Sequence, residues 1–304
     1  MTVAVVGSVN MDVVARVPRI PGPGETLLAS GFSRGGGGKG ANQAVGAARA
    51  GGVPTSFIGA VGDDADGAQL REWLADDGID VSGLATSSEP SGVALISVDD
   101  SAENTIVVVA GANHALTELT DEQRALVAEA DAVAVQLEIP IALVEAAAAA
   151  RSDGAQFVLN AAPSELMTDE DVAARVLPQV DVLIVNEHEL LDIAGVDDQD
   201  EAIDLLSGRV RALVVTLGAE GSLIALGDER AQVPAFSVTP VDTTGAGDTF
   251  CGVLAAHLGR GELRMSDLAE AARAGAAASA IAVTRTGAQP AVPTAAEVAE
   301  LLEG

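Results

Sequence analysis

Two hydrophobic patterns alternate along this chain: short apolar runs bounded by glycine or polar residues, and longer segments with helical spacing. A first apolar run, residues 2–6, is typical of a buried strand. From residue 55 onward strands and helices alternate, which indicates βαβ units and a mostly parallel sheet. The predicted strands are 2–6, 56–61, 132–137, 156–160, 182–185 and 212–216, and the predicted helices include 65–75, 141–151, 187–193, 200–206, 269–283 and 295–302.

A second group of extended segments lies outside this alternation. The sequence P-R-I-P-G-P-G-E-T after residue 17 is too rich in proline and glycine for a helix. Short pieces at 13–17 and 26–29 are expected to pair with 92–98 and 105–109, which carry β-branched residues. We therefore predict one three-layer, Rossmann-like α/β domain over residues 1–304, with a small accessory β-sheet from about 12–33 and 91–110 that serves as a lid or a dimer face.

Composition supports a single large core. Apolar residues make up 48% of the 304, yet only 2% are aromatic and tyrosine is absent, so alanine-rich helices must cover the sheet. No apolar run reaches the roughly 18 residues of a membrane span, and the start M-T-V-A-V-V-G lacks the basic segment of a secretory signal. The only cysteine, Cys251, excludes an internal disulfide and agrees with a cytoplasmic protein. We interpret Cys251 as a small buried apolar residue and not as a reactive thiol.

The formal net charge of -29 argues against a nucleic acid partner, because phosphate backbones are bound by basic surfaces. A chain this acidic can bind a phosphorylated ligand only where positive potential is local, at a helix end, a metal ion or a few placed cations. Of its 16 basic residues only Lys39 is a lysine. Genome composition and adaptation to salt both remain open as reasons for that scarcity.

Residues 241–250, V-D-T-T-G-A-G-D-T-F, combine a glycine-rich turn, a carboxylate and the start of a helical pattern. Helix N-termini carry unpaired N–H groups and a partial positive charge, and Gly245 and Gly247 let the main chain approach a bound phosphate closely. Asp248 then lies where a hydroxyl group must lose its proton to attack that phosphate. The alternative is a glycine turn in which Asp248 is an ordinary N-cap.

A second glycine-rich stretch, G-G-G-G-K-G at 35–40, is followed at once by an amphipathic helical segment. A flexible linker seldom has that neighbour, so the glycines indicate close approach to a ligand. Lys39 and Asn42 are three residues apart and share one face of the first helical turn. The stretch matches neither a Walker A loop nor a dinucleotide fingerprint, which disfavours an oxidoreductase.

Polar residues also follow the predicted strands. Asn10 and Asp12 are two apart in an extended segment, so their amide and carboxylate groups point the same way and suit hydroxyl ligands. Taken singly, each such residue fits an ordinary polar turn. Together they lie at one edge of the sheet, where open α/β sheets bind ligands: Asn10, Asp12, Glu138, Asn186, Thr216 and Asp248.

These motifs resemble the ribokinase-like (PfkB) family of carbohydrate kinases over essentially the whole chain. The motifs that carry the resemblance are G-S-V-N-M-D, G-G-K-G-A-N-Q-A, A-G-A-N, Q-L-E, N-E-H-E, T-L-G-A-E-G, D-T-T-G-A-G-D-T-F and A-V-T-R-T-G-A-Q-P. G-A-G-D together with N-x-x-E marks the family most strongly. The resemblance implies a cytoplasmic, ATP-dependent sugar kinase that needs Mg²⁺ and K⁺ and forms a homodimer through the β lid.

Carried over residue by residue, the resemblance implies that Asp248 is the general base toward the 5-hydroxyl of D-ribose. The N–H groups of Gly245, Ala246 and Gly247 would then hold the transferred phosphoryl group. Sugar-contacting positions are matched by Asn10, Asp12, Gly38, Lys39, Asn42 and Glu138. Nucleotide contacts are matched by Asn186, Thr216, Leu217, Gly218, Ala219, Glu220, Gly221, Gly247 and Ala276, and the magnesium region by Asn186 and Glu189. The monovalent-cation loop is matched by Asp242, Thr244, Ala282, Arg285, Gly287 and Ala291, mostly through main-chain carbonyls.

Two departures from the family pattern stand out. Ala276 occupies a position where the family often has Asn or His beside the nucleotide, and Ala291 one where Ser is common. Each alanine removes a side-chain hydrogen-bonding group. Two alternatives to a ribose kinase stay open: a kinase of the same family for deoxyribose, fructose or a nucleoside, and a catalytically silent sugar-binding regulatory protein. The intact Asp248 and N-x-x-E motif argue against the silent protein.

Overall fold

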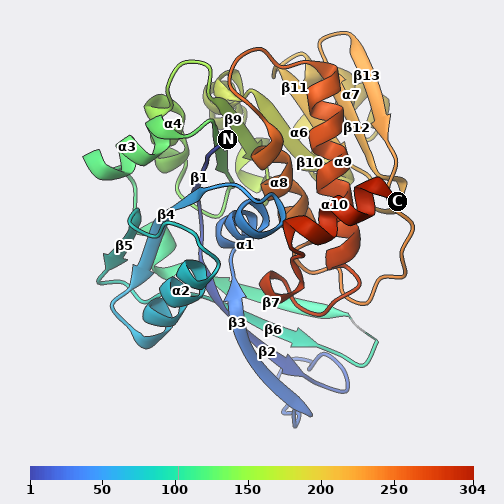
Figure 1. The fold of residues 1–304 in the computed structure, drawn as a ribbon. Coiled ribbons are helices and arrows are strands. Elements are labelled where there is room, and N and C mark those ends of the chain that lie inside the picture. Colours follow the sequence, from blue (N-terminus) through green and yellow to red (C-terminus); the bar gives the residue numbers. More distant parts are fainter. Residues whose placement is uncertain (102) are drawn as a thin grey trace.

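The computed structural model describes residues 1–101 and 103–304, and these residues form a large sheet of nine strands with a separate small sheet (Figure 1). The large sheet has the order β13-β12-β11-β10-β9-β8-β1-β4-β5. Its strands are β1 Val3–Val6, β4 Thr55–Gly62, β5 Leu84–Ser87, β8 Ala132–Val135, β9 Gln156–Asn160, β10 Val182–Asn186, β11 Ala212–Thr216, β12 Ser222–Leu226 and β13 Glu229–Val233. All neighbours from β5 to β11 are parallel, and β12 and β13 add an antiparallel hairpin. The predicted mixed α/β fold with a mostly parallel sheet is confirmed.

Helices cover both faces of this sheet. They are α1 Lys39–Val45, α2 Ala65–Asp76, α3 Asp121–Glu129, α4 Ile141–Ala150, α5 Glu170–Val176, α6 Glu187–Ala194, α7 Gln199–Ser207, α8 Ala246–His257, α9 Met265–Ala282 and α10 Ala295–Glu303. The side chains of β1 show how the faces divide, because Val3 and Val5 pack in one apolar core with α1, α8 and α9, whereas Ala4 and Val6 pack in the other with α3 to α7. Helices α8, α9, α10 and α1 lie together on the near side of the sheet in Figure 1.

The sequence did not predict α3 and α5. Each has little apolar surface, since Val127 is the buried apolar residue of α3, and Ala173 and Val176 are those of α5. Their starts are set by polar caps instead. The hydroxyl of Thr120 accepts from the N–H of Gln123 in a capping box, and Asp169 caps α5.

The small sheet has the order β3-β2-β6-β7, with β2 Asn10–Arg16, β3 Gly31–Gly37, β6 Gly92–Val98 and β7 Asn104–Val109. The strand predicted at 26–29 is wrong: residues 26–29 have no regular structure and the strand is β3. Three glycines that the sequence suggested as a ligand loop, 35–37, lie in β3, because antiparallel pairing with β2 overrides their low strand propensity. The small sheet is therefore built from residues 10–16, 31–37, 92–98 and 104–109.

Short connections place the small sheet at the carboxyl edge of the large one. Only three residues separate the end of β1 from the start of β2, and α1 begins two residues after β3 ends. In Figure 1 the small sheet projects below the large sheet, beside α1. Within the described residues, none of the helices combines the length and the apolar character that a membrane crossing requires.

Candidate active site

Asp248 lies in the first turn of α8, which begins at Ala246. Gly245 precedes the helix with φ 73°, a left-handed conformation that favours glycine. A Cβ added to Gly247 would meet no atom within 4 Å, so the space beside this residue is open. The N–H of Ala246 donates to the carbonyl of Thr243 at 3.2 Å. In the described part of the chain no such partner is present for Gly245 and Gly247, so these two amides are the available part of the predicted phosphoryl cradle.

The carboxylate of Asp248 is buried, with 8% of the residue exposed. Its Oδ2 accepts from Nδ2 of Asn42 at 2.9 Å, and its Oδ1 accepts from Nε2 of Gln43 at 3.4 Å. Burial raises the pKa of Asp248 above its ordinary value, although the Lys39 ammonium and the Asn42 amide act in the opposite direction. A carboxylate with a raised pKa has an increased affinity for a proton, as a general base requires.

Asp248 shares its surroundings with other charged groups. The pKa of Asp12 is raised to about 7 by burial and by the negative charges of Glu138 and Asp248. Burial acts to lower the pKa of Lys39, but the carboxylates of Asp248, Glu138 and Glu189 raise it above its ordinary value. Within the described residues no carboxylate oxygen lies within 4.0 Å of the Lys39 ammonium. This lysine therefore remains available to a ligand.

The predicted sugar-binding residues surround Lys39 and Asp248. Oε2 of Glu138 accepts from the main-chain N–H of Lys39 at 3.0 Å and from the hydroxyl of Ser8 at 2.5 Å. Oδ1 of Asn10 accepts from Nδ2 of Asn113 at 2.7 Å. A Cβ on Gly37 would collide with the carboxylate of Asp12, and Gly38 has φ 87° where α1 begins. These two glycines thus allow close approach of the chain to Asp12 and to the backbone of β2, and the predicted approach to a ligand stays a prediction.

A hollow of about 150 Å³ opens at the carboxyl ends of β9, β10 and β11. Cys251 also lines it; the residue is buried, as predicted, and burial raises the pKa of its thiol. The hollow brings together Lys39, Asn186, Glu189, Thr216, Gly245, Gly247 and Asp248, all predicted from the sequence. The other predicted nucleotide positions, Leu217, Gly218, Ala219, Glu220, Gly221 and Ala276, lie outside its lining.

The turn after β11 has a defined shape. The N–H of Leu217 donates to the carbonyl of Gly221 at 2.8 Å. Gly221 has φ 97°, and a Cβ there would collide with the carbonyl of Val233. Ala276 is half-buried on α9 and packs against the apolar core, so it offers a small apolar surface and no hydrogen bond.

The N-x-x-E pair forms the N-terminal cap of α6. The main-chain N–H of Asn186 donates to Oε2 of Glu189, and the N–H of Glu189 donates to Oδ1 of Asn186, both at 2.9 Å. Within the described residues no group of three or more His, Cys, Asp and Glu could hold a metal ion alone. Mg²⁺ usually keeps several waters and binds one or two carboxylates together with substrate phosphates. The pair therefore fits magnesium that arrives with a nucleotide.

The predicted monovalent-cation loop consists of two segments joined by Asp242. Its carboxylate accepts from the N–H groups of Thr244 and Gly287, each at 2.9 Å, and these bonds lower its pKa although burial acts the other way. Arg285 donates to Glu297 at 2.5 Å, so its guanidinium is directed away and only its carbonyl suits a cation. Ala291 is buried, and Ala282 ends α9. The first segment, 242–244, lies directly before α8 in the chain, and the second, 282–291, follows α9.

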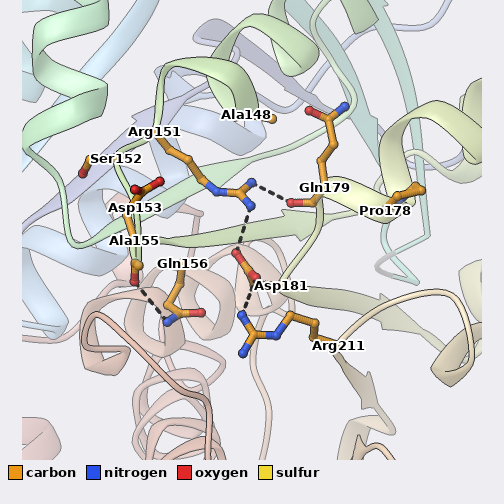
Figure 2. Close-up of a pocket in the computed structure, with 11 residues that line it drawn as sticks. Ala148, Arg151, Ser152, Asp153, Ala155, Gln156, Pro178, Gln179, Asp181 and Arg211 are labelled. Carbon is orange, nitrogen blue, oxygen red and sulfur yellow. Dashed lines mark hydrogen bonds and ion pairs between the residues drawn. The ribbon is translucent and has the colours of Figure 1, made fainter.

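A larger hollow, of about 390 Å³, lies at the opposite edge of the sheet, where β9, β10 and β11 begin (Figure 2). Figure 2 shows Asp181 between two arginines: it accepts from Nη1 of Arg211 at 3.0 Å and pairs with Arg151 at 3.6 Å. Arg151 also donates to the carbonyl of Gln179 at 2.6 Å. The charges in this hollow are largely paired with one another, so we place the active site at the smaller hollow.

A sequence model described as the pfkB family of carbohydrate kinases matches residues 1–295. The chain belongs to this family. A ribokinase of Haemophilus influenzae is 39% identical over 99% of this chain and 98% of its own length. In structure, this pfkB kinase is similar to a ribokinase of Thermotoga maritima, with a TM-score of 0.89, 33% identity and 100% of both chains covered. It is also similar to an Arabidopsis thaliana ribokinase complexed with ribose and ATP, with a TM-score of 0.87, 30% identity, and 100% of this chain and 98% of the other covered.

Membership makes this chain a sugar kinase, a phosphotransferase with an alcohol acceptor. Sequence reasoning missed the residues behind Asp248 of this pfkB kinase. Gln289 donates to Oδ1 of Asn42 at 3.2 Å, and Gln136 donates to Oε1 of Gln43 at 2.8 Å. Gln43 and Gln136 do lie in the motifs G-G-K-G-A-N-Q-A and Q-L-E, where only their neighbours had been assigned roles.

Proposed function

We propose that this kinase transfers the γ-phosphoryl group of ATP to the 5-hydroxyl of D-ribose, giving D-ribose 5-phosphate and ADP. The observation that carries the proposal is the buried carboxylate of Asp248, placed beside the open amide of Gly247 in a hollow that Lys39 also lines. The relatives support the substrates, because the two bacterial proteins are ribokinases and the A. thaliana ribokinase was crystallised with ribose and ATP.

The sugar would lie between the small sheet and α8. Asn10 and Asp12 of β2 and Lys39 of α1 offer an amide, a carboxyl and an ammonium group to hydroxyl groups of a pentose. Because its pKa is about 7, Asp12 is partly protonated at neutral pH and can both donate to and accept from a hydroxyl. Glu138 and Asn42 complete this side, and Gly38 lets the chain before α1 pass close to the backbone of Val9.

In the proposed reaction the 5-hydroxyl oxygen attacks the γ-phosphorus and the bond from phosphorus to the ADP oxygen breaks. Asp248 takes the hydroxyl proton, a contribution of roughly 10² to 10⁴ in rate. The amides of Gly245 and Gly247 and the N-terminus of α8 stabilise negative charge on the transferred group. The N–H of Ala246 joins them only if it leaves Thr243.

Two ions would add positive charge that this acidic chain lacks. Asn186 and Glu189 are the residues that would hold Mg²⁺, which when bound neutralises the phosphate oxygens of the nucleotide. K⁺ would bind main-chain carbonyls of the two segments that Asp242 joins, beside the start of α8. The residues on the nucleotide side are those of the turn 216–221, with Ala276 as an apolar contact.

We also propose that the small sheet is a lid over the sugar and the interface of a homodimer. All six residues of β7 are exposed, and four of them are apolar: Ile106, Val107, Val108 and Val109. β7 is an edge strand, so its outer main-chain groups are unpaired as well. Light scattering should give twice the chain mass, and a monomer at micromolar concentration would contradict the interface.

The deciding experiment is a phosphate-transfer assay with ATP and Mg²⁺ across pentoses, hexoses and nucleosides, with and without K⁺. The highest kcat/KM is expected for D-ribose, with a loss of rate when K⁺ is replaced by a large organic cation. Preference for deoxyribose, fructose or a nucleoside would assign a different acceptor to the same site. Ribose binding without any phosphorylated product would favour the silent sugar-binding protein.

A further inference from the structure

A chain of buried side-chain amides lies behind Asp248. Asn42 and Gln43, consecutive residues of α1, donate to different oxygens of the carboxylate, at 2.9 and 3.4 Å. Gln43 also donates to Oδ1 of Asn160 at 3.1 Å and accepts from Nε2 of Gln136 at 2.8 Å. Gln43 is 1% exposed and Gln136 is 0% exposed, so water does not compete for these bonds.

The direction of each amide follows from the carboxylate at the end of the chain. An ionised carboxylate only accepts hydrogen bonds, so Gln43 must turn its Nε2 toward Asp248 and its Oε1 away. Gln136 supplies the donor that Oε1 then needs. If the amide of Gln43 were reversed, its oxygen would face a carboxylate oxygen and its nitrogen would face another nitrogen. Asp248 therefore sets the orientation of Gln43, and the donor of Gln136 stabilises it.

The backbone around these side chains holds them close together. A Cβ on Gly252 of α8 would collide with the carbonyl of Gln43, so α1 and α8 are in direct contact beneath Asp248. A Cβ on Gly7 would collide with Oε1 of Gln136, so glycine is needed after β1 to make room for this side chain. The two glutamines are thus enclosed from both sides.

Stability alone gives no reason for a glutamine at position 136. Its Oε1 is buried and has no hydrogen-bond partner in the described residues. A buried acceptor without a partner destabilises the folded state, and an apolar side chain of similar shape avoids that loss. Gln43 is the side chain that needs the donor of Gln136, because its buried Oε1 accepts from Nε2 of Gln136.

We propose that Gln43 and Gln136 are positioning residues that hold the carboxylate of Asp248 in the orientation in which it takes the proton of the sugar hydroxyl. The inference rests on the proposed role of Asp248 as general base. With one donor on each oxygen, rotation of the carboxylate breaks a hydrogen bond, and the remaining lone pairs stay directed at the substrate. Neither glutamine contacts substrate in this assignment.

The test is Gln136→Met in the full-length protein, assayed by the rate of phosphoryl transfer in a single turnover. This change removes the donor while it keeps the length and volume of the side chain. We expect the rate to fall by about tenfold, as small displacements of catalytic groups do, while KM for ribose and ATP stays within about twofold. The melting temperature should stay within about 4 °C of the parent, because the lost bond is offset by loss of the unpartnered acceptor.

Gln156→Met is a matched control at the other edge of the same sheet. Gln156 is 1% exposed, its Oε1 also has no partner among the described residues, and its Nε2 donates to the carbonyls of Gly259 and Gly261. We expect its single-turnover rate to equal that of the parent whatever its stability. If Gln136→Met does not fold, Gln136→Asn keeps a polar amide but shortens it by one methylene, and the same loss of rate is expected.

The outcomes separate this inference from the proposed function. Turnover retained in Asp248→Asn would overturn the role of the base and, with it, the positioning role. If Asp248→Asn is inactive but Gln136→Met transfers phosphate at the parent rate, the base stands and the positioning role is overturned. A loss of rate in Gln136→Met that is matched by equal loss in Gln156→Met, or by a rise in KM for both substrates, also overturns it.

Discussion

The two edges of the large sheet differ in what their charges do. At the amino edge Arg151 and Arg211 both pair with Asp181 beside a hollow of about 390 Å³. At the carboxyl edge a hollow of about 150 Å³ contains Lys39 without an ion-pair partner among the described residues, and Asp248 with a raised pKa. We propose the smaller hollow as the active site because its charged groups remain available to a ligand, although it is not the larger of the two.

The direction of parallel strands explains the difference. Strands end at the carboxyl edge, where α6 and α8 begin and present N–H groups with partial positive charge. Strands begin at the amino edge, where α4 ends and Arg151 caps it, as suits a cation near helical carbonyls. The arginines of the amino edge therefore stabilise the fold, whereas the carboxyl edge can bind anions.

Asp248→Asn should have the largest effect on activity. A small effect would contradict the contrast between the two edges of the sheet. The amide cannot take the hydroxyl proton, so we expect kcat to fall by about 10³-fold, or about 4 kcal/mol. Ribose and ATP should still bind with affinities close to those of the parent, as calorimetry would measure. Turnover near the parent rate would remove Asp248 from the mechanism.

Asp181→Ala tests the amino edge, where we expect a loss of stability and no loss of activity. The change removes the partner of Arg151 and Arg211 and the acceptor of the Phe157 N–H at 2.9 Å. Because the Arg211 side chain is 54% exposed, we expect about 2 to 3 kcal/mol of unfolding free energy to be lost, below the full value for a buried ion pair. Urea unfolding measures this, and kcat at low temperature should be unchanged.

The same contrast shows what the sequence could predict. Polar residues after apolar runs located the carboxyl edge, because a strand end and a helix start are local features of the chain. The strand at residues 26–29 was wrong, and the hairpin of β12 and β13 was not predicted. The strands of the hairpin pair with their neighbours in the chain, whereas β3 depends on β2, since its glycines form a strand only because β2 lies beside them.

The amide chain behind Asp248 could not be predicted for the same reason. Gln43 and Gln136 are 93 residues apart, and their hydrogen bond exists only once α1 packs on the end of β8. Motif reasoning reached Asn42 and Glu138, whose polar groups match a known site, but it passed over the adjacent glutamines. Nothing in the local sequence distinguishes such a glutamine from one on the surface.

Lys39→Met tests whether the unpaired cation of the carboxyl edge binds ligand. We expect KM for ribose to rise by about 10- to 100-fold, or about 1.4 to 2.7 kcal/mol, because the charged group and its hydrogen bonds are lost. Arg211→Met at the amino edge is the matched control, since its cation is paired with Asp181. Its KM should not change. Equal effects of the two substitutions on KM would show that the loss is general and not specific to Lys39.

The smallest effect is a pH dependence of stability with opposite signs at the two edges. Asp12, at the carboxyl edge, has a pKa raised by burial and by Glu138 and Asp248 to about 7. Its contribution to stability is complete below its ordinary pKa of 3.8 and is lost as the pH rises through about 7. Relative to Asp12→Asn, the parent should lose at most about 1.4 kcal/mol of unfolding free energy per pH unit across this range.

Asp131, immediately before β8 at the amino edge, should show the reverse. Its carboxylate accepts from Arg260 at 2.7 Å, and this bond lowers its pKa below the ordinary value. Its contribution is present above the ordinary pKa and is lost as the pH falls below it. Urea unfolding between pH 2 and 8 should therefore show that, as the pH rises, the stability of the parent falls relative to Asp12→Asn but rises relative to Asp131→Asn at the acid end. If stability changed with pH in the same direction at both edges, the carboxylate of Asp12 would be as well stabilised by its neighbours as that of Asp131.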